Sequence, residues 1–138
     1  MAGFITALRT EKIGAQRWLL IDDLIYKSDI LKGRFLISRG FQTDLASIPR
    51  VFQGILPKTD LYDAPAVLHD AGYGGALVGV ADERINLVKQ WCDRIFLEAM
   101  LSCGVNKFKA NTMYQLVKAF GRPEKHPLDA SRFHYGDE

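Results

Sequence analysis

The sequence has few cysteines. Among its 138 residues it holds only Cys92 and Cys103. They lie eleven residues apart in a segment that the apolar periodicity predicts to be one helix. Their Cα atoms should therefore be about 16 Å apart, which is too far for a disulfide. We expect reduced thiols and a chain that folds in the cytosol.

Long apolar runs and targeting signals are also missing. No window approaches 18 consecutive apolar residues, the length that a membrane-spanning helix needs. The N-terminus lacks a positively charged start followed by an apolar stretch, which is the pattern of a signal peptide. We therefore expect no membrane span and no secretion by a signal peptide.

An excess of one charge is absent as well. Lysine and arginine number 18 against 16 acidic residues, so the formal net charge is +2. Nucleic-acid-binding domains usually carry a dense basic face or stripe, so we predict no nucleic-acid partner. Apolar residues make up 48% and charged residues 25%, as in an ordinary folded domain. A chain of this length forms one domain that buries about two-thirds of its unfolded surface.

The first 40 residues have the pattern of short strands separated by glycines. Apolar runs rich in Leu, Ile and aromatic residues occur at Phe4–Leu8, Arg17–Tyr26 and Arg34–Ser38. Glycines at 14, 33 and 40 separate them, which suits an antiparallel β-meander. The acidic pair Asp22-Asp23 interrupts the second run and predicts a bulge or a strand end there.

The chain from residue 41 to 121 has helical periodicity. Four helices are predicted: a short one from Pro49 to Gly54, one from Asp63 as N-cap through His69 toward Gly72, one from Ala81 or Asp82 to Cys103, and one from the cap Asn106 to Phe120. The buried stripe of the third is predicted at Ile85, Val88, Cys92, Ile95 or Phe96, and Ala99, and that of the fourth at Phe108, Thr112 or Met113, Leu116, Val117 and Phe120. Glycines at 72, 74 and 75 predict a flexible loop after the second helix.

These patterns predict one α+β domain over residues 1–138. A small N-terminal antiparallel β-meander (1–40) would pack on three to four α-helices (41–121). The last segment, 122–138, has proline, histidine and charge without periodicity, and we expect it to be extended.

Several polar side chains stand inside apolar, small-residue segments. They come from the stretch 40–50, from the end of the second helix and from the third helix. A buried polar group is costly unless it finds a partner, so such residues bond one another, bind a ligand or do chemistry. We predict a polar network of Thr43, Asp44, Ser47, His69, Asp70 and Asp93.

Three interpretations of this network are open, and the first is favoured. It could be structural, locking three elements together; it could be a metal or catalytic site; or it could bind a small ligand. For the second, one imidazole with carboxylates suits Zn²⁺, Mn²⁺ or Fe²⁺, so Asp44, His69 and Asp93 are the candidate metal ligands and catalytic residues. His69 and Asp70 are adjacent on a helix and diverge by about 100°, so only one of them could face a given ion. We expect no cofactor, with a divalent metal ion as the alternative.

Other catalytic patterns are incomplete. Helical His-Asp phosphohydrolases need a further histidine upstream, and His69 is the first histidine of the chain. Ser47 is not in a Gly-x-Ser-x-Gly turn, and the glycines at 72–75 follow a helix where a phosphate-binding loop would precede one. Enzymatic activity is therefore not the favoured prediction.

Four segments carry a resemblance to a known family. They are Gly-Phe-Gln-Thr-Asp-Leu-Ala-Ser-Ile-Pro-Arg at Gly40–Arg50, the His-Asp helix at Ala66–Asp70, the aspartate at Asp93, and Met113-Tyr114 followed by Phe120-Gly121. In these segments the chain resembles a small family of tailed bacteriophages and prophages, the domain-of-unknown-function family thirteen fifty-three. The resemblance implies a phage context, and it implies no reaction.

Our leading functional hypothesis follows from that context. We expect a phage or prophage protein that docks to other virion proteins, as a tail- or virion-associated component located in the virion or the host cytoplasm. Phe133, His134 and Tyr135 in the C-terminal segment are candidate partner-binding residues. The alternatives are a metal-dependent hydrolase acting on cell-wall material and a host-directed inhibitor.

Overall fold

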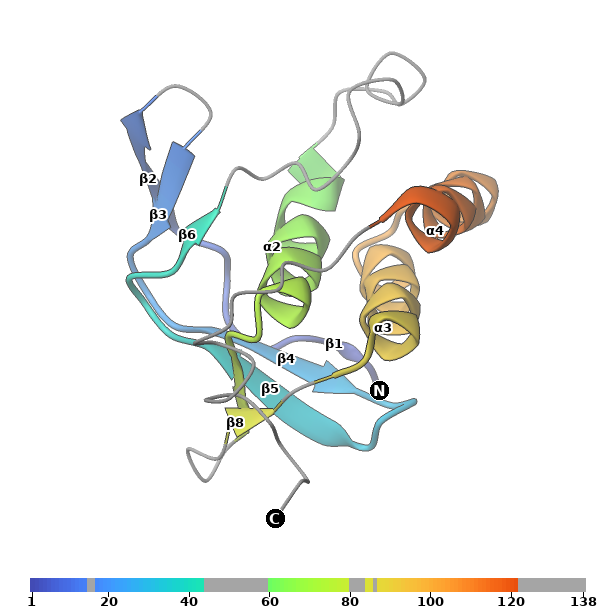
Figure 1. Ribbon diagram of the computed structural model, residues 1–138, viewed down its shortest axis with the longest axis horizontal. Helices are drawn as coiled ribbons and strands as arrows, with labels where there is room; N and C mark the ends of the chain where they lie inside the picture. The colour runs from blue at the N-terminus through green and yellow to red at the C-terminus, as the bar shows by residue number, and fades with distance from the viewer. Residues whose placement is uncertain (15–16, 44–59, 80–83, 86, 122–138) are drawn as a thin grey trace.

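The computed structural model describes residues 1–14, 17–43, 60–79, 84–85 and 87–121. In these ranges six strands come first, and the short strands β7 (Leu77–Gly79) and β8 (Arg84–Ile85) lie between the helices α2 (Asp63–Tyr73) and α3 (Lys89–Ser102), so the α+β class predicted from the sequence is confirmed. In Figure 1 the two helices α2 and α3 lie over one face of the larger sheet, and α4 (Lys107–Phe120) packs on the far side of α3. No helix in the described ranges is long and apolar enough to cross a membrane.

The strands form two antiparallel sheets. The larger has the order β1-β4-β5-β7-β8 and the smaller the order β2-β3-β6. Their bounds are β1 Gly3–Phe4, β2 Thr10–Gly14, β3 Arg17–Leu20, β4 Leu24–Ser28, β5 Gly33–Ile37, β6 Gln42–Thr43, β7 Leu77–Gly79 and β8 Arg84–Ile85.

The break between the two sheets lies at Asp22-Asp23. The predicted run 17–26 is divided there into β3 and β4, which belong to different sheets. Asp23 stabilises this corner: its backbone oxygen accepts a hydrogen bond from Thr6 Oγ1 at 3.1 Å, and its carboxylate accepts one from the Arg39 amide at 2.9 Å. The predicted single meander is therefore two sheets joined at an acidic corner.

The described helices are η1 Asp60–Tyr62, α2 Asp63–Tyr73, α3 Lys89–Ser102 and α4 Lys107–Phe120. Asn106 caps α4 as predicted, because its side chain accepts hydrogen bonds from the amides of Phe108 and Lys109. The prediction that Asp63 caps α2 is wrong. The 3₁₀ turn η1 leads directly into α2, so Tyr62 is the N-cap and Asp63 lies in the first turn.

The segment between α2 and α3 differs from the prediction. A long helix was expected from residue 81 or 82, yet Arg84–Ile85 is strand β8, paired with β7, and α3 begins at Lys89. Ile85 lies opposite Leu77 in that pairing and is buried in the hydrophobic core. The loop predicted after the glycines at 72–75 contains β7. The short helix predicted from Pro49 to Gly54 lies outside the described residues.

The core has two parts. One lies between the larger sheet and the helices α2 and α3, and the other between α3 and α4, around Phe96, Met100 and Met113. Three residues of the predicted stripes are exposed instead: Val88 by 60%, Phe108 by 79% and Phe120 by 60%. Because α4 packs mainly on α3, it buries only a narrow strip formed by Ala110, Met113 and Val117.

Candidate functional site

A cluster of polar side chains lies where α2 faces α3. His69 and Tyr73 come from α2, and Lys89 and Asp93 come from α3. Each pair is four residues apart, so both members project from the same side of their helix. The close approach of α2 to α3 brings the two pairs together. We call these four residues the Asp93 cluster.

The carboxylate of Asp93 is its centre. Asp93 Oδ1 accepts hydrogen bonds from the Tyr73 hydroxyl at 2.5 Å and pairs with His69 Nε2 at 2.8 Å. Asp93 Oδ2 accepts a hydrogen bond from Lys89 Nζ at 2.7 Å. Asp93 and His69 are each only 1% exposed. The carboxylate is thus held by three donors, as a buried charge requires.

Lys89 connects the cluster to α4. Its ammonium group donates to the backbone oxygens of Val117 at 2.8 Å and Lys118 at 3.0 Å, in the last turn of α4. Carbonyls at a helix C-terminus have no partner within the helix and carry partial negative charge. The Lys89 side chain therefore joins α4 to the buried carboxylate of α3.

The protonation states follow from these contacts. Burial alone would raise the pKa of Asp93, but hydrogen bonds from His69, Lys89 and Tyr73 outweigh it and hold that pKa below its usual value. Burial lowers the pKa of His69, more than its hydrogen bond to Asp93 raises it. Burial, then the bond to Asp93, raises the pKa of Tyr73. At neutral pH, Asp93 is therefore an anion, His69 is neutral and Tyr73 keeps its proton.

These states decide the tautomer of His69. An ionised carboxylate only accepts hydrogen bonds, so Nε2 of His69 carries the proton and Nδ1 carries a lone pair. This Nδ1 is buried and has no hydrogen-bond partner within the described part of the chain. The imidazole lies between two rings, with centroids 4.1 Å from that of Tyr73 and 4.7 Å from that of Phe96. A neutral histidine oriented by a carboxylate and presenting one lone pair is the form that accepts a proton or ligates a metal.

The structure brings the predicted residues together as two pairs. His69 bonds Asp93, and Thr43 Oγ1 donates to Asp70 Oδ2 at 2.6 Å, which ties β6 to α2. His69 and Asp70 thus contact different elements, because adjacent helical side chains diverge. Asp44 and Ser47 of the predicted network lie outside the described residues. So do the candidate partner-binding residues Phe133, His134 and Tyr135.

Sequence reasoning missed Tyr73 and Lys89. Each lies one helical turn from a residue that was predicted: Tyr73 follows His69 by four positions, and Lys89 precedes Asp93 by four. A search for donors at that spacing around each buried polar residue would have found both.

One edge of the cluster reaches the surface. A hollow of about 450 Å³ is lined by Val88, Lys89, Gln90, Asp93 and Lys118, between the start of α3 and the end of α4. Within the described ranges no group of three or more His, Cys, Asp or Glu side chains is placed to hold a metal ion. A metal at this site would therefore need ligands beyond His69 and Asp93.

The fold and the cluster define a small α+β protein in which the helices α2, α3 and α4 are joined through one buried carboxylate and the lysine bound to it. Residues 18–117 match the family described as "Protein of unknown function (DUF1353)", and the chain belongs to that family. No curated protein and no solved structure gives a significant match.

Proposed function

We propose that the chain is a docking component of a tailed-phage or prophage particle, associated with the tail or virion, that binds other virion proteins. The resemblance of its motifs to phage proteins supports this context, and the family to which the chain belongs is one of unknown function. A docking role needs a stable fold and a complementary surface, and it needs no reactive group.

One contrast carries the proposal: the polar side chains of the cluster are used inside the molecule, whereas large apolar ones face outward. Both oxygens of Asp93 are occupied, and Lys89 donates three hydrogen bonds. Phe108 at the start of α4 is 79% exposed, and Val88 before α3 is 60% exposed. Exposed aromatic residues commonly supply the binding energy of protein interfaces, since they bury a large area at a low entropy cost.

The C-terminal segment is the second part of the proposed surface. In the sequence it begins at residue 122, two positions after Phe120, which is 60% exposed at the end of α4. Phe133, His134 and Tyr135 would add aromatic side chains to a partner contact.

The test uses the phage or induced prophage that encodes the chain. Virions would be purified by density gradient, and the chain would be quantified in them by mass spectrometry. We expect the wild type in the particles and a clear loss with Phe108→Ser. Ile13→Ser removes an apolar side chain that is 45% exposed on β2, and it should leave incorporation unchanged. Absence of the wild-type chain from virions, together with capture of a host protein, would favour the host-directed inhibitor instead.

A second candidate function rests on the lone pair of His69 Nδ1. In a metal-dependent hydrolase acting on cell-wall material, His69 would hold the ion through Nδ1, and Asp93 would orient the imidazole from the opposite nitrogen. Asp44 would be a ligand or the general base. The role of Asp93 differs from the sequence prediction, which made it a ligand.

This candidate is tested with purified protein. Metal content after dialysis against zinc or manganese would be compared between wild type and His69→Gln, and peptidoglycan hydrolysis would be assayed in parallel. A stoichiometric metal that His69→Gln loses, with hydrolysis that Asp93→Asn abolishes, would replace docking by catalysis as the function. Peptidoglycan left intact by the metal-loaded wild type would end the hydrolase hypothesis.

A further inference from the structure

A second hollow, far from the Asp93 cluster in the sequence, lies at the turn between β4 and β5. Its volume is about 440 Å³, and its lining is Lys27, Ser28, Asp29, Lys32, Gly33 and Arg34. Three cations and one carboxylate leave this lining with two net positive charges. The whole chain has a net charge of +2, so the residues outside this lining carry equal numbers of positive and negative charges.

The three cations of the hollow are Lys27, Lys32 and Arg34. Within the described part of the chain, neither Lys27, Lys32 nor Arg34 forms an ion pair. Asp29 is used elsewhere: its Oδ2 accepts from the amide of Ala2 at 2.8 Å, and its Oδ1 lies 3.4 Å from the N-terminal ammonium group. The positive charge of the hollow is therefore available to a ligand.

Two features of these cations destabilise the β4–β5 hairpin. Lys27 and Arg34 are direct cross-strand partners in the β4–β5 register, and like charges at such positions destabilise a sheet. Lys32 has a φ of 53°, the only positive φ of a non-glycine residue in the described ranges. Glycine would adopt that conformation at lower cost. Residues that destabilise the local fold are often kept at binding sites, and both of these features lie around one hollow.

Hydrogen bonds to Glu98 and Ser28 fix the conformation of the turn. Glu98 Oε2 on α3 accepts hydrogen bonds from the amides of Asp29 at 3.1 Å and Ile30 at 3.0 Å, while its Oε1 accepts from the Tyr26 hydroxyl at 2.6 Å. Ser28 Oγ accepts from the amide of Leu31 at 3.1 Å. These bonds preorganise the turn before any ligand arrives, which reduces the entropy lost on binding.

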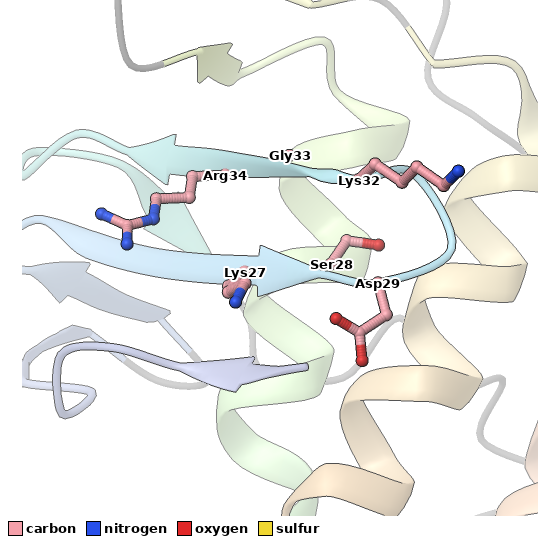
Figure 2. A pocket seen from close by; sticks show the side chains of 6 residues that line it. All are labelled: Lys27, Ser28, Asp29, Lys32, Gly33 and Arg34. Carbon is pink, nitrogen blue, oxygen red and sulfur yellow. The ribbon is translucent and has the colours of Figure 1, made fainter. Parts of the chain in front are cut away.

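The shape and lining indicate the class of ligand. Figure 2 shows Lys32 and Arg34 pointing toward opposite ends of the hairpin, with Lys27 between them. An anion that meets all three must be elongated and carry several charges. Among the described residues that line the hollow none is aromatic, so they offer no ring on which a base could stack, in contrast to single-strand nucleic-acid sites. The planar guanidinium fork of Arg34 matches phosphate geometry.

We propose that this hollow binds a small oligophosphate anion, with Arg34 and Lys32 holding its two ends and Lys27 its middle. The site is separate from the docking surface on α4 and does not depend on it.

The test is calorimetric titration of the full chain with sodium tripolyphosphate at low ionic strength. We expect one site per chain, with affinity that weakens as salt is added. Arg34→Gln should weaken binding about tenfold, because it removes a charge-assisted pair. Lys107→Gln makes the same change of charge at an exposed position on α4 and should leave the affinity within about twofold.

Lys32→Gly separates binding from folding. It should raise the melting temperature, since glycine suits the positive φ, and at the same time weaken binding several-fold. Unchanged affinity in Lys32→Gly, or equal losses in Arg34→Gln and Lys107→Gln, would overturn the site. So would citrate binding as tightly as tripolyphosphate, tighter binding of a single-stranded DNA oligonucleotide that Arg34→Gln abolishes, or no binding at about 1 mM ligand.

Discussion

Replacing Asp93 with asparagine tests the central claim that this carboxylate joins three helices. The change keeps the size of the side chain and removes only its charge and one acceptor. His69 and Tyr73 would then donate to a neutral amide oxygen in place of an anion. The new amide group would be a donor facing the ammonium of Lys89, which is itself a donor.

The expected cost follows from burial. Breaking a buried ion pair by removing one partner costs about 3–5 kcal/mol. The Lys89 side chain is 31% exposed and keeps the backbone oxygens of Val117 and Lys118 as acceptors, so part of that cost is avoided. We therefore expect Asp93→Asn to lower the free energy of unfolding by about 2–3 kcal/mol. For a domain of this size the melting temperature should fall by roughly 10 °C.

Urea unfolding measures this loss, followed by circular dichroism and by the fluorescence of Trp18 and Trp91. Asp22→Asn is the matched control, because Asp22 bonds Arg9 at 2.8 Å with both side chains about half exposed. An exposed pair contributes at most about 1 kcal/mol. If Asp93→Asn costs no more than Asp22→Asn, with equal denaturant slopes, the buried carboxylate does not hold the helices together.

Two further predictions concern acid and packing. The folded state binds a proton at His69 more weakly than the unfolded chain does, so stability should fall as pH drops below the ordinary histidine pKa of about 6.5, and His69→Gln should flatten this part of the urea-midpoint profile. Gly72→Ala should destabilise by about 1–3 kcal/mol, because the added Cβ would lie 2.9 Å from the Sγ of Cys92. Removing that sulfur in Gly72→Ala/Cys92→Ala should relieve the clash, and Gly3→Ala, which has no atom within 4 Å of the new Cβ, should cost little in thermal melts.

A contrary result is defined for both the acid prediction and the packing prediction. A His69→Gln variant that keeps the full acid dependence between about pH 6.5 and 5 would show that another group titrates there. The loss of stability in Gly72→Ala/Cys92→Ala should be smaller than the summed losses of the two single variants. If it equals that sum, the contact between positions 72 and 92 is not the cause of the loss in Gly72→Ala.

Features that depend on a few neighbouring residues could be predicted from the sequence. Asn106 caps α4, and the segment around His69 is helical, because capping and helical periodicity act over one or two turns. Asp22-Asp23 interrupts the β run as expected, since two charged residues in succession cannot both avoid a buried face of a strand. Cys92 and Cys103 are both free thiols, as their helical spacing requires.

Features that depend on residues distant in the sequence could not be predicted from the sequence. Ile85 fits a helical stripe, yet it lies in β8 because pairing with β7 completes the edge of the larger sheet. Val88, at the N-cap of α3, and Phe108, on α4, were predicted in the core and are exposed. Phe108 is exposed because α4 packs mainly on α3 and buries only a narrow strip. Periodicity shows that a helix has an apolar side, and it does not show how much of that side a neighbour covers.

The candidate site likewise has a part that the sequence predicts and a part that only the tertiary packing decides. The sequence alone determined that His69, Asp70, Thr43 and Asp93 would be polar groups in apolar surroundings, and hence that they would need partners. Only the packing of α2 on α3 decided that His69 meets Asp93 while Asp70 meets Thr43. That packing also brought in Tyr73 and Lys89. The reason is geometric: a helix determines the direction of each side chain from its own axis, but the rotation of one helix against another decides which side chain it faces.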